Sequence, residues 1–191
     1  FVPSKITQRS LVLVDEMGRS EPMTEERDLF GTLSLSPDGR RIAVDPEHRL
    51  WVYGPGRNER MRLVPENRDY DEGYPVWDAD GSRVYYASNH SGNWEIYSRV
   101  PGAAQSEIVM QREFDQFPVA VAPDGTLAFQ ESNTVTGDDI WFLPPWGVPS
   151  PALTGPGTDA MCDFSADGRW LAFASDASGR SEIYVKAVDR D

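Results

Sequence analysis

Four aspartates in two pairs are the side chains of this sequence best suited to acid–base chemistry. Asp78 and Asp80 lie at one predicted turn, and Asp163 and Asp167 lie at another. Two carboxylates held close together can hydrolyse a glycosidic bond, because one protonates the leaving oxygen while the other acts as nucleophile or base. Asp80 and Asp167 are better explained as turn residues, since Asp bonds to nearby backbone amides. For Asp78 and Asp163, which precede the turns, a glycosidase is a minor alternative.

The sequence lacks the combinations of side chains that nucleophilic or metal-assisted catalysis needs. The single cysteine, Cys162, lies in the apolar run 160–164 and is predicted to be a buried hydrophobe. A cysteine nucleophile needs a basic partner, and both histidines, His48 and His90, fall in predicted turns. The acidic stretch 69–72 lacks the alternation of a calcium loop, so we interpret it as a solvated connector. We therefore predict no catalytic, cofactor-binding or metal-binding residues, and no cofactor.

The six tryptophans fall into two groups. Most stand in predicted strands, where a Trp usually packs between sheets because its side chain buries a large area. Trp94 and Trp146 flank predicted loops instead. These two are the candidate surface aromatics, on which a sugar or a protein partner could stack.

The composition limits the classes of partner. The formal net charge of −13 repels phosphate backbones, so a nucleic acid is excluded as a predicted partner. No apolar run approaches the roughly 20 residues of a membrane span, so we expect no membrane insertion. The first residues carry no signal peptide and begin with Phe1, so we expect a processed or excised segment.

Four similar segments repeat along the chain, each centred on an Asp-Gly pair. The pairs lie 42, 44 and 43 residues apart. They are Asp38-Gly39, Asp80-Gly81, Asp124-Gly125 and Asp167-Gly168. Asp-Gly between two apolar runs predicts a β-hairpin, because a tight turn needs positive φ and Gly adopts it without strain. We take these eight residues as the structural turn signature of the repeat.

Each hairpin is followed by a third apolar run, and three of the four repeats show a weaker fourth one. Four short strands in about 43 residues are typical of one propeller blade. The sequence therefore predicts an all-β fold, a β-propeller of four-stranded antiparallel blades with about four blades visible. The predicted single segment 1–191 divides into a leading strand pair and connector at 1–30, blades at 31–72, 73–115 and 116–158, and a partial blade at 159–191.

These motifs resemble the TolB-type propeller repeat, a relative of the WD repeat. Its pattern is an apolar residue, Ser-Pro-Asp-Gly, an apolar strand, Ser-x-x-x-Gly, and then Glu or Asp, Ile, and Tyr or Trp. Residues 36–39 match the first part, as do residues 165–168 with Ala166 in place of Pro, and residues 88–97 and 175–184 match the second. The resemblance covers about residues 31–188. Such propellers occur in TolB, on some bacterial serine/threonine kinases and beside prolyl-oligopeptidase catalytic domains, which implies a bacterial and extracytoplasmic protein.

The strand count does not give a self-closed ring of four blades. Residues 11–14 and 21–24 are predicted strands that precede the first full blade, and the last repeat already supplies three strands. Together these five strands exceed the four of one blade. Three hypotheses follow: a leading part of a larger propeller, open edges covered between subunits in a homo-oligomer, or a compact four-blade ring with one strand displaced.

The expected function is a non-enzymatic binding scaffold that mediates protein–protein contact through the propeller loops or one face. Propellers present rigid loop surfaces, and no site in the sequence is chemically decisive. The alternatives are an accessory propeller segment of a larger hydrolase or kinase, and a carbohydrate-binding propeller.

Overall fold

The structure is a computed structural model, which describes residues 8–54, 56, 59–65, 69–155 and 157–188. All regular secondary structure in these residues is β-strand, as the sequence predicts. This part of the chain contains no helix that is long and apolar enough to cross a membrane. Both ends of the predicted segment 1–191 lie outside the described residues.

Within the described residues, seventeen strands form five antiparallel sheets, in which strands adjacent in sequence are adjacent in space. A pair comes first, β1 (Val12–Val14) and β2 (Ser20–Pro22). Blade 1 contains β3 (Phe30–Leu35), β4 (Ile42–Pro46), β5 (Trp51–Tyr53) and β6 (Arg60–Arg62). Blade 2 contains β7 (Glu72–Trp77), β8 (Val84–Ser88), β9 (Glu95–Arg99) and β10 (Glu107–Met110). Blade 3 contains β11 (Asp115–Val121), β12 (Leu127–Asn133), β13 (Gly137–Leu143) and β14 (Ser150–Leu153). Blade 4 contains β15 (Asp159–Phe164), β16 (Trp170–Ser175) and β17 (Glu182–Ala187).

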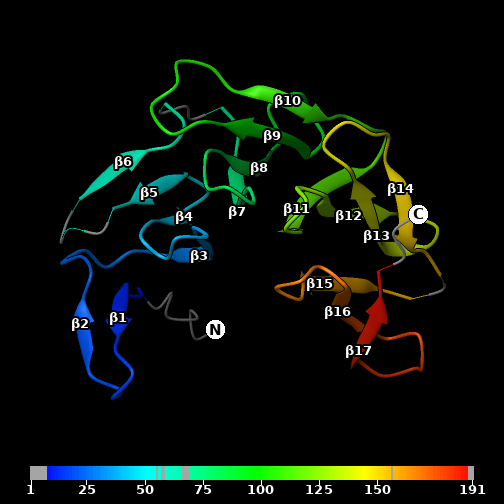
Figure 1. The fold of residues 1–191 in the computed structure, drawn as a ribbon. Helices are drawn as coiled ribbons and strands as arrows, with labels where there is room; N and C mark the ends of the chain where they lie inside the picture. The colour runs from blue at the N-terminus through cyan, green and yellow to red at the C-terminus, as the bar shows by residue number, and fades with distance from the viewer. Residues whose placement is uncertain (1–7, 55, 57–58, 66–68, 156, 189–191) are drawn as a thin grey trace, which may run out of the picture.

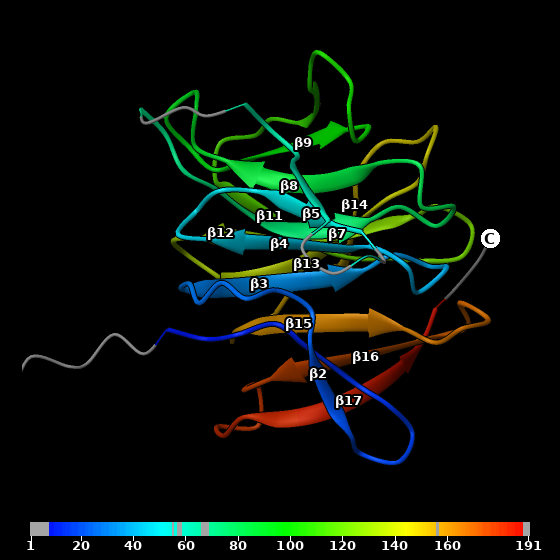
Figure 2. The same ribbon diagram turned by 90° about the vertical axis from the view of Figure 1, so that its left-hand side faces the viewer.

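The four blades are arranged around a common centre (Figure 1). The first strand of each blade, β3, β7, β11 or β15, lies closest to this centre, and successive inner strands contact one another. Figure 2 shows β3, β4, β8 and β15 lying along one common axis, with β4 antiparallel to β3, as expected for blade strands that follow the axis of a propeller. The fold is therefore an all-β propeller array, with the β1–β2 pair beside blade 1 and the blade 4 sheet at the other end of the chain.

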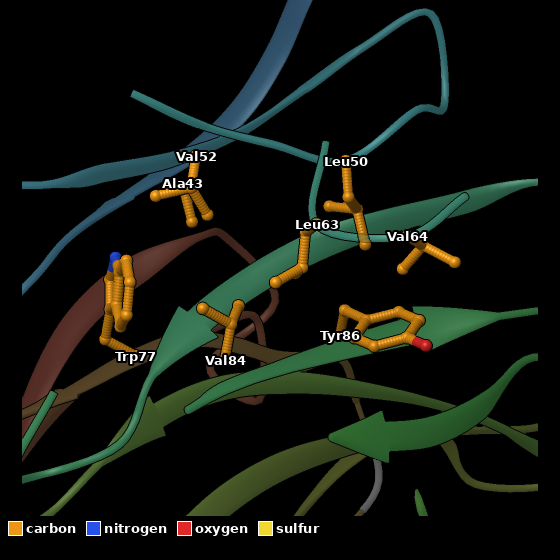
Figure 3. Close-up of a cluster of buried hydrophobic side chains, with 8 residues drawn as sticks. All are labelled: Ala43, Leu50, Val52, Leu63, Val64, Trp77, Val84 and Tyr86. Carbon is orange, nitrogen blue, oxygen red and sulfur yellow. The ribbon is translucent and has the colours of Figure 1, made fainter. Parts of the chain in front are cut away.

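The hydrophobic cores lie between neighbouring blades rather than within one sheet. Figure 3 shows the core between blades 1 and 2, formed by Ala43, Leu50, Val52, Leu63, Val64, Trp77, Val84 and Tyr86. A second core joins blades 2 and 3 through Ile96 and Phe129, and a third joins blades 3 and 4 through Ile140 and Phe173. Each blade thus depends on its neighbour to bury the apolar face of its sheet.

Candidate binding site at the centre of the propeller

A pocket of about 530 Å³ lies where the inner strands of all four blades end. Its wall includes residues of β3, β7, β11 and β15, among them Leu33, Leu35, Val76, Val119, Cys162 and Asp163. Because four separate sheets supply the wall, the shape of the pocket depends on how the blades are packed. Strands packed in this way give a more rigid wall than loops.

A register irregularity in the inner strand of each blade helps to position these side chains. The pairing of the inner strand with the next strand shifts between Phe30 and Leu33, and equivalent shifts occur in β7, β11 and β15. In two blades a non-glycine residue adopts positive φ there, Tyr74 at 56° and Met161 at 50°. Such bulges bend a strand and change the direction in which the following side chains point.

The pocket combines an apolar wall with a solvent-facing carboxylate. Leu33 is 59% exposed and Leu35 is 56% exposed, although both are large apolar side chains. Asp163, on the β15 part of the same pocket wall, is exposed and accepts a hydrogen bond of 2.8 Å from the backbone N–H of Phe164. This surface suits a ligand that offers both apolar groups and a positive charge.

Asp78 also lines the pocket, but its carboxylate accepts hydrogen bonds from residues of its own turn. The Ser82 hydroxyl donates a hydrogen bond of 2.8 Å to one carboxylate oxygen, and the Arg83 backbone N–H donates one of 3.1 Å to the other. Asp78 therefore acts as a turn cap, and Asp163 is the carboxylate of the pair that faces solvent. Within the described residues, no group of three or more His, Cys, Asp or Glu side chains is placed to hold a metal ion.

The eight residues of the turn signature lie at the four β-hairpins between the first and second strands of the blades. Their glycines all have positive φ: Gly39 at 70°, Gly81 at 72°, Gly125 at 87° and Gly168 at 67°. The preceding aspartates accept hydrogen bonds from the backbone two residues further on, as Asp38 does from Arg40, Asp80 from Ser82, Asp124 from Thr126 and Asp167 from Arg169.

In blades 1 and 4 a serine hydroxyl adds a second bond to the turn aspartate, at 2.6 Å from Ser36 to Asp38 and from Ser165 to Asp167. These serine hydrogen bonds, together with the backbone bonds, hold the pKa of Asp38 and Asp167 below their ordinary value. Such bonds stabilise the charged form of a carboxyl. The turn aspartates are therefore anchored in their own hairpins.

The two candidate surface aromatics lie in different settings. Trp94 is only partly exposed, because its ring packs with Tyr74 and Phe117 at centroid distances of 6.1 and 5.7 Å. Trp146 is 100% exposed in the turn between β13 and β14. The strand register puts Trp94 at the end of the blades where the inner strands begin, and Trp146 at the end with the Asp-Gly turns. The structure thus does not bring these two side chains together.

Sequence reasoning was wrong about Glu72, which it placed in a solvated connector. Glu72 begins β7 and is only 7% exposed, on the wall of a second pocket of about 650 Å³ between blades 1 and 2. Burial raises the pKa of its carboxyl to about 7, against the opposing effect of the Arg99 and Arg62 charges. A sequence signal for this burial is the position of Glu72 next to the apolar run 74–77, since it is the first residue of the inner strand β7.

Cys162 is a free, buried cysteine that contributes to the core between blades 3 and 4, as its apolar setting predicts. Burial raises the pKa of its thiol to about 12, and the nearby Asp163 charge acts in the same direction. A thiol held in its protonated form is a poor nucleophile.

Comparison with known proteins gives structural matches only. No family model matches the sequence, and no curated protein does. Among solved structures, a putative TolB from Agrobacterium tumefaciens is similar over 97% of this chain and 71% of its own, with a TM-score of 0.76 and 18% identity. The fold is that of a TolB-type β-propeller. This confirms the fold that the repeat motifs imply.

Two further structures illustrate the range of proteins with this fold. TolB from Acinetobacter baumannii is similar over 93% of this chain and 46% of its own, with a TM-score of 0.75 and 16% identity. An oligogalacturonate lyase from Vibrio parahaemolyticus is similar over 94% of this chain and 55% of its own, with a TM-score of 0.68 and 18% identity. The propeller is thus shared by proteins with different activities, so function has to be argued from the site.

Proposed function

We propose that this propeller is a non-enzymatic scaffold that binds an extended segment of a partner protein in the central pocket. The observation that carries the proposal is the pocket wall itself, in which β3 exposes Leu33 and Leu35 and β15 exposes the Asp163 carboxylate. Exposed large apolar side chains in a concave site are typical of binding surfaces. The likeness to two TolB proteins is consistent with such a role.

The chemistry of the pocket also suggests the kind of segment. An exposed carboxylate in a chain of net charge −13 attracts a basic side chain, and the leucines would contact its apolar neighbours. The binding segment is therefore expected to combine at least one Lys or Arg with apolar residues.

Selection from a phage-displayed random peptide library on the immobilised chain tests this function. Selected peptides should be rich in basic and apolar residues, and Leu35→Asp should weaken their binding at least about tenfold, since a hot-spot contact contributes about 2 kcal/mol or more. Asp163→Lys should weaken binding in the same way by reversing the charge. Val135→Asp is the matched control, because Val135 is 88% exposed in the β12–β13 turn, outside the pocket wall.

Peptides that bind equally well to the wild type and to Leu35→Asp would show that the central pocket is not the binding site. Failure to select any peptide would count against an extended protein segment as the ligand.

A further inference from the structure

The pocket between blades 1 and 2 buries a carboxylate that has no partner. Glu72 is 7% exposed and lines this pocket of about 650 Å³. Among the residues that the structure describes, none donates a hydrogen bond to this carboxylate or forms an ion pair with it, and Arg99 and Arg62 act on it only as nearby charges. Burying a charge without a partner destabilises a fold, so the position of Glu72 calls for an explanation.

A buried cation lines the same pocket. Arg99, at the end of β9, is also 7% exposed. Its guanidinium donates hydrogen bonds of 3.1 Å to the Ser106 hydroxyl and 2.5 Å to the Ala103 carbonyl, which uses two of the five N–H donors of an arginine. The Nε–H group has no acceptor in the described part of the chain. Glu72 and Arg99 are thus opposite charges on one pocket wall that no ion pair joins.

The strand register places both side chains on one face of blade 2. Glu72 is paired with Ser88 on β8, and Arg99 is paired with Val84 on the same strand. Ser88 and Val84 are an even number of residues apart, and alternate side chains of a strand point to the same face. This face packs on blade 1, as the position of Val84 in the core of Figure 3 shows.

The repeat does not require this pair of charges. The positions of Glu72 and Arg99 can be found in the other blades from the distance to the turn aspartate and from the strand pairing. They hold Phe30 and Tyr53 in blade 1, Gln116 and Leu143 in blade 3, and Asp159 and Lys186 in blade 4. Lys186 is exposed, so among the described blades only blade 2 buries a carboxylate and a cation together at these positions.

Aromatic side chains line the same pocket. The rings of Tyr86 and Tyr97 stack with their centroids 5.8 Å apart, and the ring of Tyr70 lies edge-on against His90 at 4.6 Å. Aromatic faces attract an ammonium group and also offer a large apolar contact area. The pocket volume of about 650 Å³ falls within the range of small-molecule sites, about 300–1,000 Å³.

We propose that the pocket between blades 1 and 2 binds a small zwitterion, whose ammonium group pairs with Glu72 and whose carboxylate pairs with Arg99. The charges of the two side chains cancel, so a ligand that carries both signs pairs with each and leaves neither charge buried alone. The tyrosine rings contact the apolar or aromatic part of the ligand. A free amino acid and a dipeptide share this chemistry and differ in the distance between their charges.

This site is independent of the function proposed for the central pocket. No described residue lines both pockets. Binding of a zwitterion between blades 1 and 2 can therefore be tested separately from binding of a protein segment at the centre.

A nuclear magnetic resonance titration of the ¹⁵N-labelled chain tests the proposal, with L-phenylalanine and the dipeptide L-phenylalanylglycine as probes. At least one of them should shift the amide signals of Ser88, Tyr97 and Arg99 in a saturable way. Phenethylamine lacks the carboxylate and 3-phenylpropionate lacks the ammonium group, so each should bind at least about tenfold more weakly than the better zwitterion. The better of the two zwitterions identifies the ligand as an amino acid or a peptide.

Glu72→Gln should weaken binding of the zwitterion at least about tenfold, because it removes the charge that pairs with the ammonium group. Loss of folding cannot imitate this result, since the change removes a buried charge from the native state. Glu113→Gln, at an exposed position, is the matched control, and Leu35→Asp alters the central pocket. Both should leave the affinity for the zwitterion unchanged.

Three results would each overturn the proposal. The first is that neither zwitterion shifts these amide signals. The second is that the zwitterion binds Glu72→Gln as tightly as the wild type. The third is that phenethylamine or 3-phenylpropionate binds as tightly as the zwitterion, which would show that the pocket recognises a single charge.

Discussion

At the scale of single residues, burial decides the direction in which the pKa of three carboxyl groups shifts, and nearby charges do not. Glu72, at the start of β7, is almost fully buried and is flanked by the Arg99 and Arg62 charges, yet desolvation outweighs them and raises its pKa to about 7. Removing a carboxylate from water favours its neutral form. Asp45 and Glu131 follow the same rule, since burial raises the pKa of both. These groups make the stability of the fold depend on pH.

Glu72→Gln should stabilise the protein at neutral to basic pH. The native state binds the Glu72 proton more tightly than the unfolded chain, so the wild type loses stability as pH rises from about 4.5 to about 7. Gln cannot ionise and should avoid this loss, gaining up to about 3 kcal/mol at about pH 8 and almost nothing at about pH 4. Urea unfolding at both pH values measures the difference. Glu113→Gln, at an exposed position, is the control and should show no such pH-dependent gain.

At the scale of elements, the hairpin between the first two strands is the unit that the sequence repeats. In blade 1 the Gly39 N–H bonds to the Ser36 carbonyl at 2.8 Å, and the Asp38 side chain caps the turn. Gly39 has φ of 70°, where a side chain is strained even without a steric neighbour. The turn thus depends on backbone conformation and on one short-range side-chain cap.

Gly39→Ala should lower the free energy of unfolding by about 1–2 kcal/mol, the usual cost of positive φ for a residue with a Cβ. A Cβ at Gly39 would meet no atom within 4 Å, so steric clash does not contribute. Gly155→Ala is the matched control, because it also has open space but no positive φ. Gly155→Ala should be neutral or slightly stabilising, and equal effects of the two changes in denaturant unfolding would contradict the backbone explanation.

At the scale of the whole molecule, stability comes from the surfaces between blades. The core clusters each join consecutive units of the array, from the β1–β2 region to blade 4. In such an array each unit contributes its own stability and that of the interface with its neighbour. The same type of side chain therefore contributes more to the free energy of unfolding where a neighbouring blade packs on it than where it is exposed.

Ile140→Ala should destabilise the 191-residue chain by about 2–5 kcal/mol, because it leaves a cavity in the core between blades 3 and 4. Ile183→Ala should change the stability by less than about 0.5 kcal/mol, since the side chain is already 75% exposed. Both changes remove the same atoms from equivalent positions, so the comparison isolates the effect of the covering blade. Equal losses in denaturant unfolding would mean that something already covers Ile183 in solution.

The sequence by itself determined the all-β propeller fold, because the information lies within a few residues of chain. Asp-Gly turns at near-constant spacing and alternating apolar runs predict hairpins locally, and their repetition predicts blades. Only the tertiary structure decided the burial of Glu72, the half-buried setting of Trp94 and the exposure of Ile183. Burial depends on which surface stands opposite a side chain, and segments distant in sequence supply that surface. The central pocket could not be predicted for the same reason, since its wall exists only where four strands from four blades meet.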